Sequence, residues 1–119
     1  MKKIYFLKNC NTCQRIINSL SLGDDFEFQD IKKQPLQPTE LDYLKSLAGR
    51  YESLFSRRAK LYKERGLKDE ALQEEDYRQY ILEHYTFLKR PVIVSGQQIF
   101  IGNSPKIVSS AQLFFNNEG

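Results

Sequence analysis

Two cysteines lie between a short strand pattern and a helix pattern near the start of the chain, and this arrangement limits the fold more than any other feature. Residues Lys3–Leu7 are mostly β-branched or aromatic, which predicts a short buried strand. Cys10 and Cys13 follow, and apolar residues then recur at helical spacing until Gly23, a helix-stop signal. A second strand pattern begins at Phe26. This strand–helix–strand unit predicts two parallel strands joined by a right-handed crossover.

The middle of the chain, residues 36–86, carries helical patterns. Pro35 and Pro38 interrupt the chain before it, and Thr39 stands where a helix cap is expected. An apolar stripe after this residue predicts a short helix. Further helical segments are expected at 51–55, 59–65 and 74–85.

The C-terminal part of the chain returns to strand patterns. The runs 92–94 and 99–101 are apolar and rich in β-branched residues, and the turn between them contains glycine, so they predict a hairpin. Asn103 or Ser104 is expected to cap a final helix that has Pro105 in its first turn.

The order of these elements predicts an α/β protein with a thioredoxin-like plan. The βαβ unit and the ββα unit combine most simply into one four-stranded mixed sheet with helices packed on it. Residues 1–34 and 88–117 would form this part, and residues 36–86 would be a helical insertion. The length of 119 residues fits a single domain that spans 1–119.

Composition excludes several classes of protein. The chain is 40% hydrophobic and 13% aromatic, which is enough to fill one core and rules out wholesale disorder. No apolar run approaches the roughly 20 residues that span a bilayer, and the N-terminal segment lacks the apolar stretch of a secretory signal. We therefore expect a cytoplasmic protein without membrane contact, and we also expect a monomer.

The charge pattern gives little support for nucleic-acid binding. The net charge of +3 is too small to predict direct contact with a nucleic acid. Cations concentrate in the segment Arg57–Lys68, and acidic residues follow it directly. This segment is either the solvated face of a helix or a site for an anion or a partner.

Cys10 and Cys13 are the main candidates for chemistry, and they are the only cysteines of the chain. A Cys-x-x-Cys pattern between a strand and a helix is typical of redox sites. Cys10 would lie just before the helix, where unpaired amides and the positive end of the helix dipole stabilise a thiolate. We expect Cys10 to be the nucleophile, and Cys13, one turn later, to be the resolving thiol that releases an adduct.

Two other interpretations of the cysteine pair remain open. A structural zinc site needs two further Cys or His ligands, and His84 is the only histidine, so no metal is expected. The second alternative is that both cysteines are buried and chemically inert.

His84 lies near the end of a predicted helix, where capping or packing is a more common role than catalysis. No pattern in the sequence predicts an organic cofactor.

Arg90 and Pro91, which precede an apolar strand pattern, form the second candidate site. In a thioredoxin-like fold, a proline at this place faces the Cys-x-x-Cys motif and is often cis. Arg90 would then project near Cys10 and hold a thiolate or a bound oxyanion by charge-assisted hydrogen bonds. The alternative is that Arg90 only flanks a strand edge. Arg57 and Arg58 are further cationic candidates.

Three segments of the chain together resemble the arsenate reductase (ArsC-like) family with its Spx branch. They are Ile4–Cys13, Leu54–Leu67 and Leu88–Val94. The resemblance covers nearly the whole chain, with the segments in the same order and at similar spacing. It implies a thioredoxin-like fold with a helical insertion.

The resemblance to the reductases implies an oxidoreductase. In the glutathione- and glutaredoxin-dependent enzymes, the cysteine that matches Cys10 attacks arsenate, and the arginine that matches Arg90 belongs to the oxyanion site. We therefore expect Cys10 to attack an oxyanion or a disulfide, with Cys13 resolving the adduct as an intramolecular disulfide. Glutaredoxin, thioredoxin or glutathione, the last as a co-substrate, would then reduce the pair. The expected substrate-binding residues around this site are Asn11, Thr12, Arg57, Arg58 and Pro91.

The Spx branch implies a different function. Typical reductases lack a cysteine at Cys13, whereas the pair Cys10 and Cys13 resembles Spx, a redox-sensing regulator that binds the C-terminal domain of the RNA polymerase α subunit. The segment Arg58–Lys60 also resembles Spx, and Gly49 approximately matches the glycine that Spx uses toward polymerase. The stretch Phe6–Asn9 lacks the histidine that precedes the catalytic cysteine in characterised reductases. The alternative function is therefore a polymerase-binding transcriptional regulator.

Overall fold

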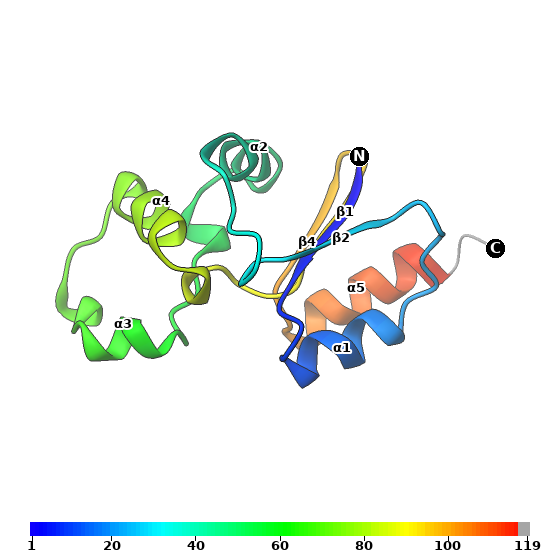
Figure 1. The fold of residues 1–119 in the computed structure, drawn as a ribbon, viewed down its shortest axis with the longest axis horizontal. Coiled ribbons are helices and arrows are strands. Elements are labelled where there is room, and N and C mark those ends of the chain that lie inside the picture. The colour runs from blue at the N-terminus through cyan, green and yellow to red at the C-terminus, as the bar shows by residue number, and fades with distance from the viewer. Residues whose placement is uncertain (117–119) are drawn as a thin grey trace. The chain divides into compact units, whose positions relative to one another are not determined.

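The computed structural model describes residues 1–116, and the chain divides into two compact units (Figure 1). The sheet unit consists of Met1–Lys33 together with Arg90–Gly119, and the helical unit is Gln34–Lys89. Both the predicted single domain and the predicted sheet part extend past residue 116, outside the described residues. No helix in the described part of the chain is long and apolar enough to cross a membrane.

The sheet unit is built on a four-stranded mixed sheet, as the sequence predicts. Its elements are β1 (Lys2–Phe6), α1 (Asn11–Asn18), β2 (Glu27–Asp30), β3 (Val92–Ser95), β4 (Gln98–Ile101) and α5 (Pro105–Asn116). The strand order is β2-β1-β3-β4, with β1 parallel to β2 and antiparallel to β3, and β3 antiparallel to β4. Strand β1 therefore has a neighbouring strand on each side, and a short loop connects its end to α1.

Helices α1 and α5 lie side by side on one face of the sheet (Figure 1). Ile4 of β1, Ile93 of β3 and Phe100 of β4 occupy paired positions on this face, and all three are buried. Leu20, which follows α1, and Phe115 of α5 pack against them. Each such side chain stabilises the fold by about 1.5–3 kcal/mol when it leaves water. Ile17 of α1 packs against the same cluster, which holds α1 on the sheet.

The structure places two helix boundaries differently from the prediction. Helix α1 ends before Gly23 is reached. Helix α2 (Pro38–Ala48) is capped by Gln37, so the prediction of Thr39 as the cap is wrong. The backbone amide of Gln37 donates to the Glu40 carboxylate at 3.0 Å, and the side chain of Gln37 accepts from the Glu40 amide. This reciprocal pair satisfies two amides that would otherwise lack partners, and Pro38 suits the first helical position.

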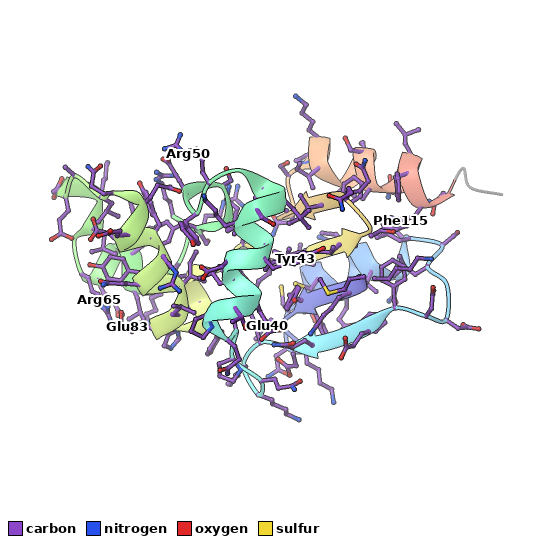
Figure 2. The ribbon with its side chains drawn as sticks, turned by 90° about the horizontal axis from the view of Figure 1, so that it is seen from above. Glu40, Tyr43, Arg50, Arg65, Glu83 and Phe115 are labelled. Carbon is purple, nitrogen blue, oxygen red and sulfur yellow. The ribbon has the colours of Figure 1, made fainter. Side chains whose placement is uncertain are left out.

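The helical unit packs short helices around aromatic side chains. Its elements after α2 are η1 (Glu52–Leu54), α3 (Lys60–Glu64), η2 (Leu67–Asp69), α4 (Glu74–Glu83) and η3 (Tyr85–Phe87), where η marks a 3₁₀-helix. Phe55 is fully buried, and its ring stacks on Phe87 at 5.4 Å and meets Tyr77 at 4.9 Å between centroids. At the surface of this unit, Figure 2 shows Arg65 beside Glu83, and their side chains form an ion pair at 2.8 Å.

The cap predicted for the last helix is confirmed, and His84 takes the capping role, one of the two roles expected for it. The amide of Ile107 donates to Ser104 Oγ at 3.3 Å, so Ser104 caps α5. The amide of Thr86 donates to His84 Nδ1 at 3.1 Å, which gives His84 a capping role at the start of η3. The aromatic ring of Tyr85 stacks on His84 at 4.5 Å.

Replacing Phe55 by alanine should destabilise the protein by about 3–5 kcal/mol, because the change leaves a cavity among aromatic rings that cannot close over it. The matched control is Phe28→Ala, since Phe28 is 48% exposed, and it should cost about 1 kcal/mol or less. Urea unfolding followed by circular dichroism measures both. Equal losses in the two variants would contradict the central place of Phe55.

Candidate active site

The loop between β1 and α1 holds Cys10 at the start of the helix. The amide of Cys10 donates to the Leu7 carbonyl at 3.0 Å, and the Cys10 carbonyl accepts the amide of Gln14 at 3.1 Å. The Gln14 side-chain amide reaches back to the Lys8 carbonyl at 3.3 Å. Cys10 is the N-cap of α1 in an extended conformation, and its side chain is partly exposed. The backbone therefore presents the thiol at the positive end of the helix.

The surroundings of Cys10 favour its thiolate. Partial burial alone would raise the pKa of Cys10, but several other interactions outweigh it and hold the pKa below its ordinary value. They come from the amide and the thiol of Cys13, the charge of Arg90, and the amide of Thr12. The sulfur makes no capping hydrogen bond of ordinary geometry, so these amides act on it mainly as nearby dipoles.

Cys13 differs from Cys10 both in its burial and in the direction of its pKa shift. It is fully buried, and this burial raises its pKa to about 11. The amide of Leu7 and the charge of Arg90 lower the pKa, whereas the hydrogen bond to Cys10 and its negative charge raise it. At neutral pH, Cys13 is therefore a neutral thiol whose hydrogen bond supports the Cys10 thiolate. Both cysteines are free thiols in this structure.

Arg90 and Pro91 lie at the same end of the sheet as the two cysteines. Tyr5 near the end of β1 pairs with Val92 at the start of β3, which brings the residues before β3 toward the loop after β1. The Arg90–Pro91 peptide bond is cis, and the Pro91 carbonyl accepts the Gly102 amide at 2.9 Å. Arg90 lies close enough to both cysteines for its positive charge to lower their pKa.

Asn11 and Thr12 stand between the cysteines in the first turn of α1. Asn11 is exposed, and Thr12 is partly buried with its amide directed toward Cys10. The structure thus brings together Cys10, Cys13, Thr12 and Arg90, with Asn11 and Pro91 beside them.

Arg57 and Arg58 belong to the helical unit. Arg57 Nη2 donates to Glu52 Oε2 at 2.6 Å and to the Tyr77 hydroxyl at 3.0 Å. Half-buried Lys89 lies near this group, and its burial, followed by the charge of Arg57, lowers its pKa. Arg58 is exposed and makes no hydrogen bond or ion pair with another described residue. Neither arginine lies in the sheet unit that carries the cysteines.

Leu7 is the site residue that sequence reasoning missed. It acts on both cysteines through its backbone, because its carbonyl accepts the amide of Cys10 and its amide approaches the sulfur of Cys13. No side-chain pattern signals such a role, and only the strand-to-helix geometry reveals it. Within the described residues, no group of three or more His, Cys, Asp or Glu side chains forms a metal site. The arrangement is suited to nucleophilic thiol chemistry.

Comparison with protein families gives one match. The model of the ArsC family matches residues 5–111, a range that contains Cys10, Cys13 and Arg90. No curated protein matches the sequence.

Several solved structures share the fold. An arsenate reductase from Vibrio cholerae superposes with a TM-score of 0.71 at 22% identity, over 92% of this chain and 96% of that chain. An arsenate reductase (ArsC) related protein from Brucella melitensis gives 0.66 at 23% identity, over 92% of each chain. A protein of Staphylococcus aureus COL gives 0.75 at 26% identity, over 95% of this chain and 99% of that one.

The rate of alkylation of Cys10 by iodoacetamide should reach half its maximum below pH 8.5, the ordinary thiol pKa, because only the thiolate reacts. Arg90→Gln should move this midpoint upward, since it removes a positive charge that lowers the pKa of Cys10. Arg15→Gln is the matched control, because Arg15 is exposed on α1 and is not among the groups that contribute most to the pKa of Cys10. Mass spectrometry of the Cys10 peptide follows the reaction, and an unchanged midpoint in Arg90→Gln would contradict the assigned role.

Proposed function

Because the chain belongs to the ArsC family, we propose that it is a thiol oxidoreductase of that family in which Cys10 is the nucleophile and Cys13 the resolving thiol. The observation that carries the proposal is that the pKa values of two neighbouring thiols are shifted in opposite directions. The pKa of partly exposed Cys10 is lowered, whereas the pKa of buried Cys13 is raised to about 11. Such a pair supplies one thiolate that meets the substrate and one protected thiol that acts second.

The reaction with a disulfide proceeds in two exchange steps. The Cys10 thiolate attacks one sulfur of the substrate, forms a mixed disulfide and expels the other half as a thiolate. Cys13 then loses its proton, and its sulfur attacks Cys10 Sγ, forms the Cys10–Cys13 disulfide and expels the second half. Two electrons pass from the protein thiols to the substrate, and an external thiol reductant returns them.

Arsenate is the second substrate that this proposal covers. Cys10 would displace water from protonated arsenate and form a sulfur–arsenic bond, which the positive charge of Arg90 would stabilise. Attack by Cys13 on Cys10 Sγ would then release arsenite, with arsenic reduced by two electrons and the cysteines joined as a disulfide. Glutaredoxin, thioredoxin or glutathione would restore the thiols.

Arsenate-dependent and disulfide-dependent consumption of NADPH test the proposal. The purified protein would be coupled separately to glutathione with glutaredoxin and to thioredoxin with its reductase. We expect turnover with at least one substrate, and Cys10→Ser should abolish it because the nucleophile is lost. The coupling system that supports turnover identifies the reductant.

Cys13→Ser serves as the matched variant, since it removes a thiol without removing the nucleophile. With a disulfide substrate it should accumulate a mixed disulfide on Cys10, visible as a mass increase equal to half of the substrate. A complete absence of adduct in Cys13→Ser would contradict the assigned order of attack. Absence of turnover with both substrates and both reductants would refute the enzymatic function.

A redox-sensing regulator of the Spx type is the second candidate function. The observation that favours it is that Cys10 and Cys13 are already hydrogen-bonded as free thiols, so oxidation can join them directly. Gly49, which approximately matches the polymerase-contacting glycine of Spx, is exposed at the end of α2 with a φ of 94°. Only glycine adopts this conformation without strain.

Binding to the C-terminal domain of the RNA polymerase α subunit tests the second candidate. A regulator should capture this domain with an affinity that changes at least severalfold when Cys10 and Cys13 are oxidised, and Cys13→Ser should remove the change. The measurement is a pull-down, quantified by fluorescence anisotropy, with oxidised and reduced protein. No capture in either redox state would exclude this function.

A further inference from the structure

The charged side chains of the sheet unit are divided unevenly between the two ends of its sheet. The register places the last residues of β1, β2 and β4 and the first residue of β3 at one end, which is the end that carries Cys10. Five cations follow or precede the strands there, namely Lys8, Lys32, Lys33, Arg90 and Lys106. Asp30 is the one carboxylate among the described residues at this end.

At the opposite end of the same sheet, carboxylates outnumber lysines. Asp24, Asp25 and Glu27 lie at or before the start of β2, beside Lys2 and Lys3 at the start of β1. Two of these carboxylates form ion pairs with the lysines, Lys2 with Asp25 at 3.0 Å and Lys3 with Glu27 at 3.7 Å. The positive charge of this end is therefore neutralised by its own neighbours.

The four lysines at the Cys10 end are not neutralised in this way. Lys8, Lys32, Lys33 and Lys106 are exposed, and none of them forms an ion pair with another described residue. The Asp30 carboxylate accepts the backbone amide of Lys32 at 3.1 Å. Moreover, the sequence contains no acidic residue from position 1 to 23 or from 90 to 116. Within the sheet unit, the end that carries Cys10 therefore has an excess of positive charge.

We propose that this cationic end makes the Cys10 thiolate select disulfides that carry carboxylates over neutral and cationic disulfides. The inference rests on the proposed thiol oxidoreductase function and names its substrate class and two residues that determine specificity, Lys8 and Lys106. Lys8 lies two positions before the nucleophile. Lys106 is in the first turn of α5, which follows β4. Just after β4, the amide of Gly102 donates to the Pro91 carbonyl, so this end of β4 lies beside the residues before β3. The exchange steps are those given above, and the lysines change only how often a substrate reaches the thiolate.

Three disulfides of similar size test the selection. Dithiodipropionate is a dianion, bis(2-hydroxyethyl) disulfide is neutral, and cystamine is a dication. Rapid-mixing measurements give the rate at which each consumes Cys10, and each rate is divided by the rate with N-acetylcysteine amide, a neutral reference thiol. We expect the normalised preference for dianion over dication to be about tenfold at low salt. It should fall toward one at high salt, because ions screen exposed charges.

Substitutions locate the effect. Lys8→Gln and Lys106→Gln should each reduce the dianion-to-dication preference, and together by about threefold or more. Lys2→Gln is the matched control, because it removes the same charge from the opposite end of the sheet, and it should leave the preference unchanged. An equal reduction in Lys2→Gln would mean that net charge alone is responsible, and this would overturn the proposal.

The outcomes separate this inference from the function on which it rests. If Cys10 reacts with none of the disulfides, the proposed oxidoreductase function fails. If Cys10 reacts with all of them at normalised rates that do not differ, the function stands and the charge selection is overturned.

Two sources of anionic disulfides are distinguished by a further pair of substrates. Glutathione disulfide represents small acidic thiols, and a peptide with glutamates on both sides of a mixed disulfide represents acidic protein segments. Each is compared with its amidated, less acidic counterpart. A faster reaction than the counterpart supports the proposal and identifies the source, whereas the absence of any gain for both substrates would overturn it.

Discussion

The peptide groups around Leu7 tie the reactive cysteines to the end of the central strand, and the rest of the site depends on this connection. The Leu7 carbonyl accepts the amide of Cys10 at 3.0 Å, while its amide approaches the sulfur of Cys13. Because β1 lies between β2 and β3, its register is set on both edges. A shift of one residue would turn buried Ile4 to the other face and move both thiols, so the apolar pattern of β1 also specifies the position of the chemistry.

The sequence predicts the architecture well because its signals are local and repeated. Short β-branched runs mark the strands, and membership of the ArsC family, which has a thioredoxin-like fold, confirms the predicted plan. The helix caps show the limit of such reasoning. Thr39 has the right residue type for a cap, yet Gln37 and Glu40 satisfy each other's amides and the cap lies two residues earlier. A reciprocal pair of this kind competes with single-residue propensity, and only the structure shows which arrangement is adopted.

The thiol site was predictable in part for similar reasons. The Cys-x-x-Cys spacing and the position of Arg90 are visible in the sequence, whereas the backbone role of Leu7 has no side-chain signature. The charge at the Cys10 end was also hidden, because Lys8 and Lys106 are far apart in the chain and the register brings their strand ends together. Arg90 and these lysines act at different ranges. Arg90 changes the pKa of the thiols at close range, whereas exposed lysines act through solvent and are screened by salt.

The asymmetry between the two thiols also explains how the second step of the proposed reaction becomes favourable only after the first. In the free protein, the hydrogen bond to Cys10 and the negative charge of its thiolate add to burial in raising the pKa of Cys13. When Cys10 is bound to a substrate, that charge is gone, while the Leu7 amide and Arg90 still favour the Cys13 thiolate. The pKa of Cys13 therefore falls when the adduct forms. In the proposed reaction, burial would keep Cys13 from reacting with solvent oxidants first, and the adduct itself would activate Cys13 for attack on Cys10.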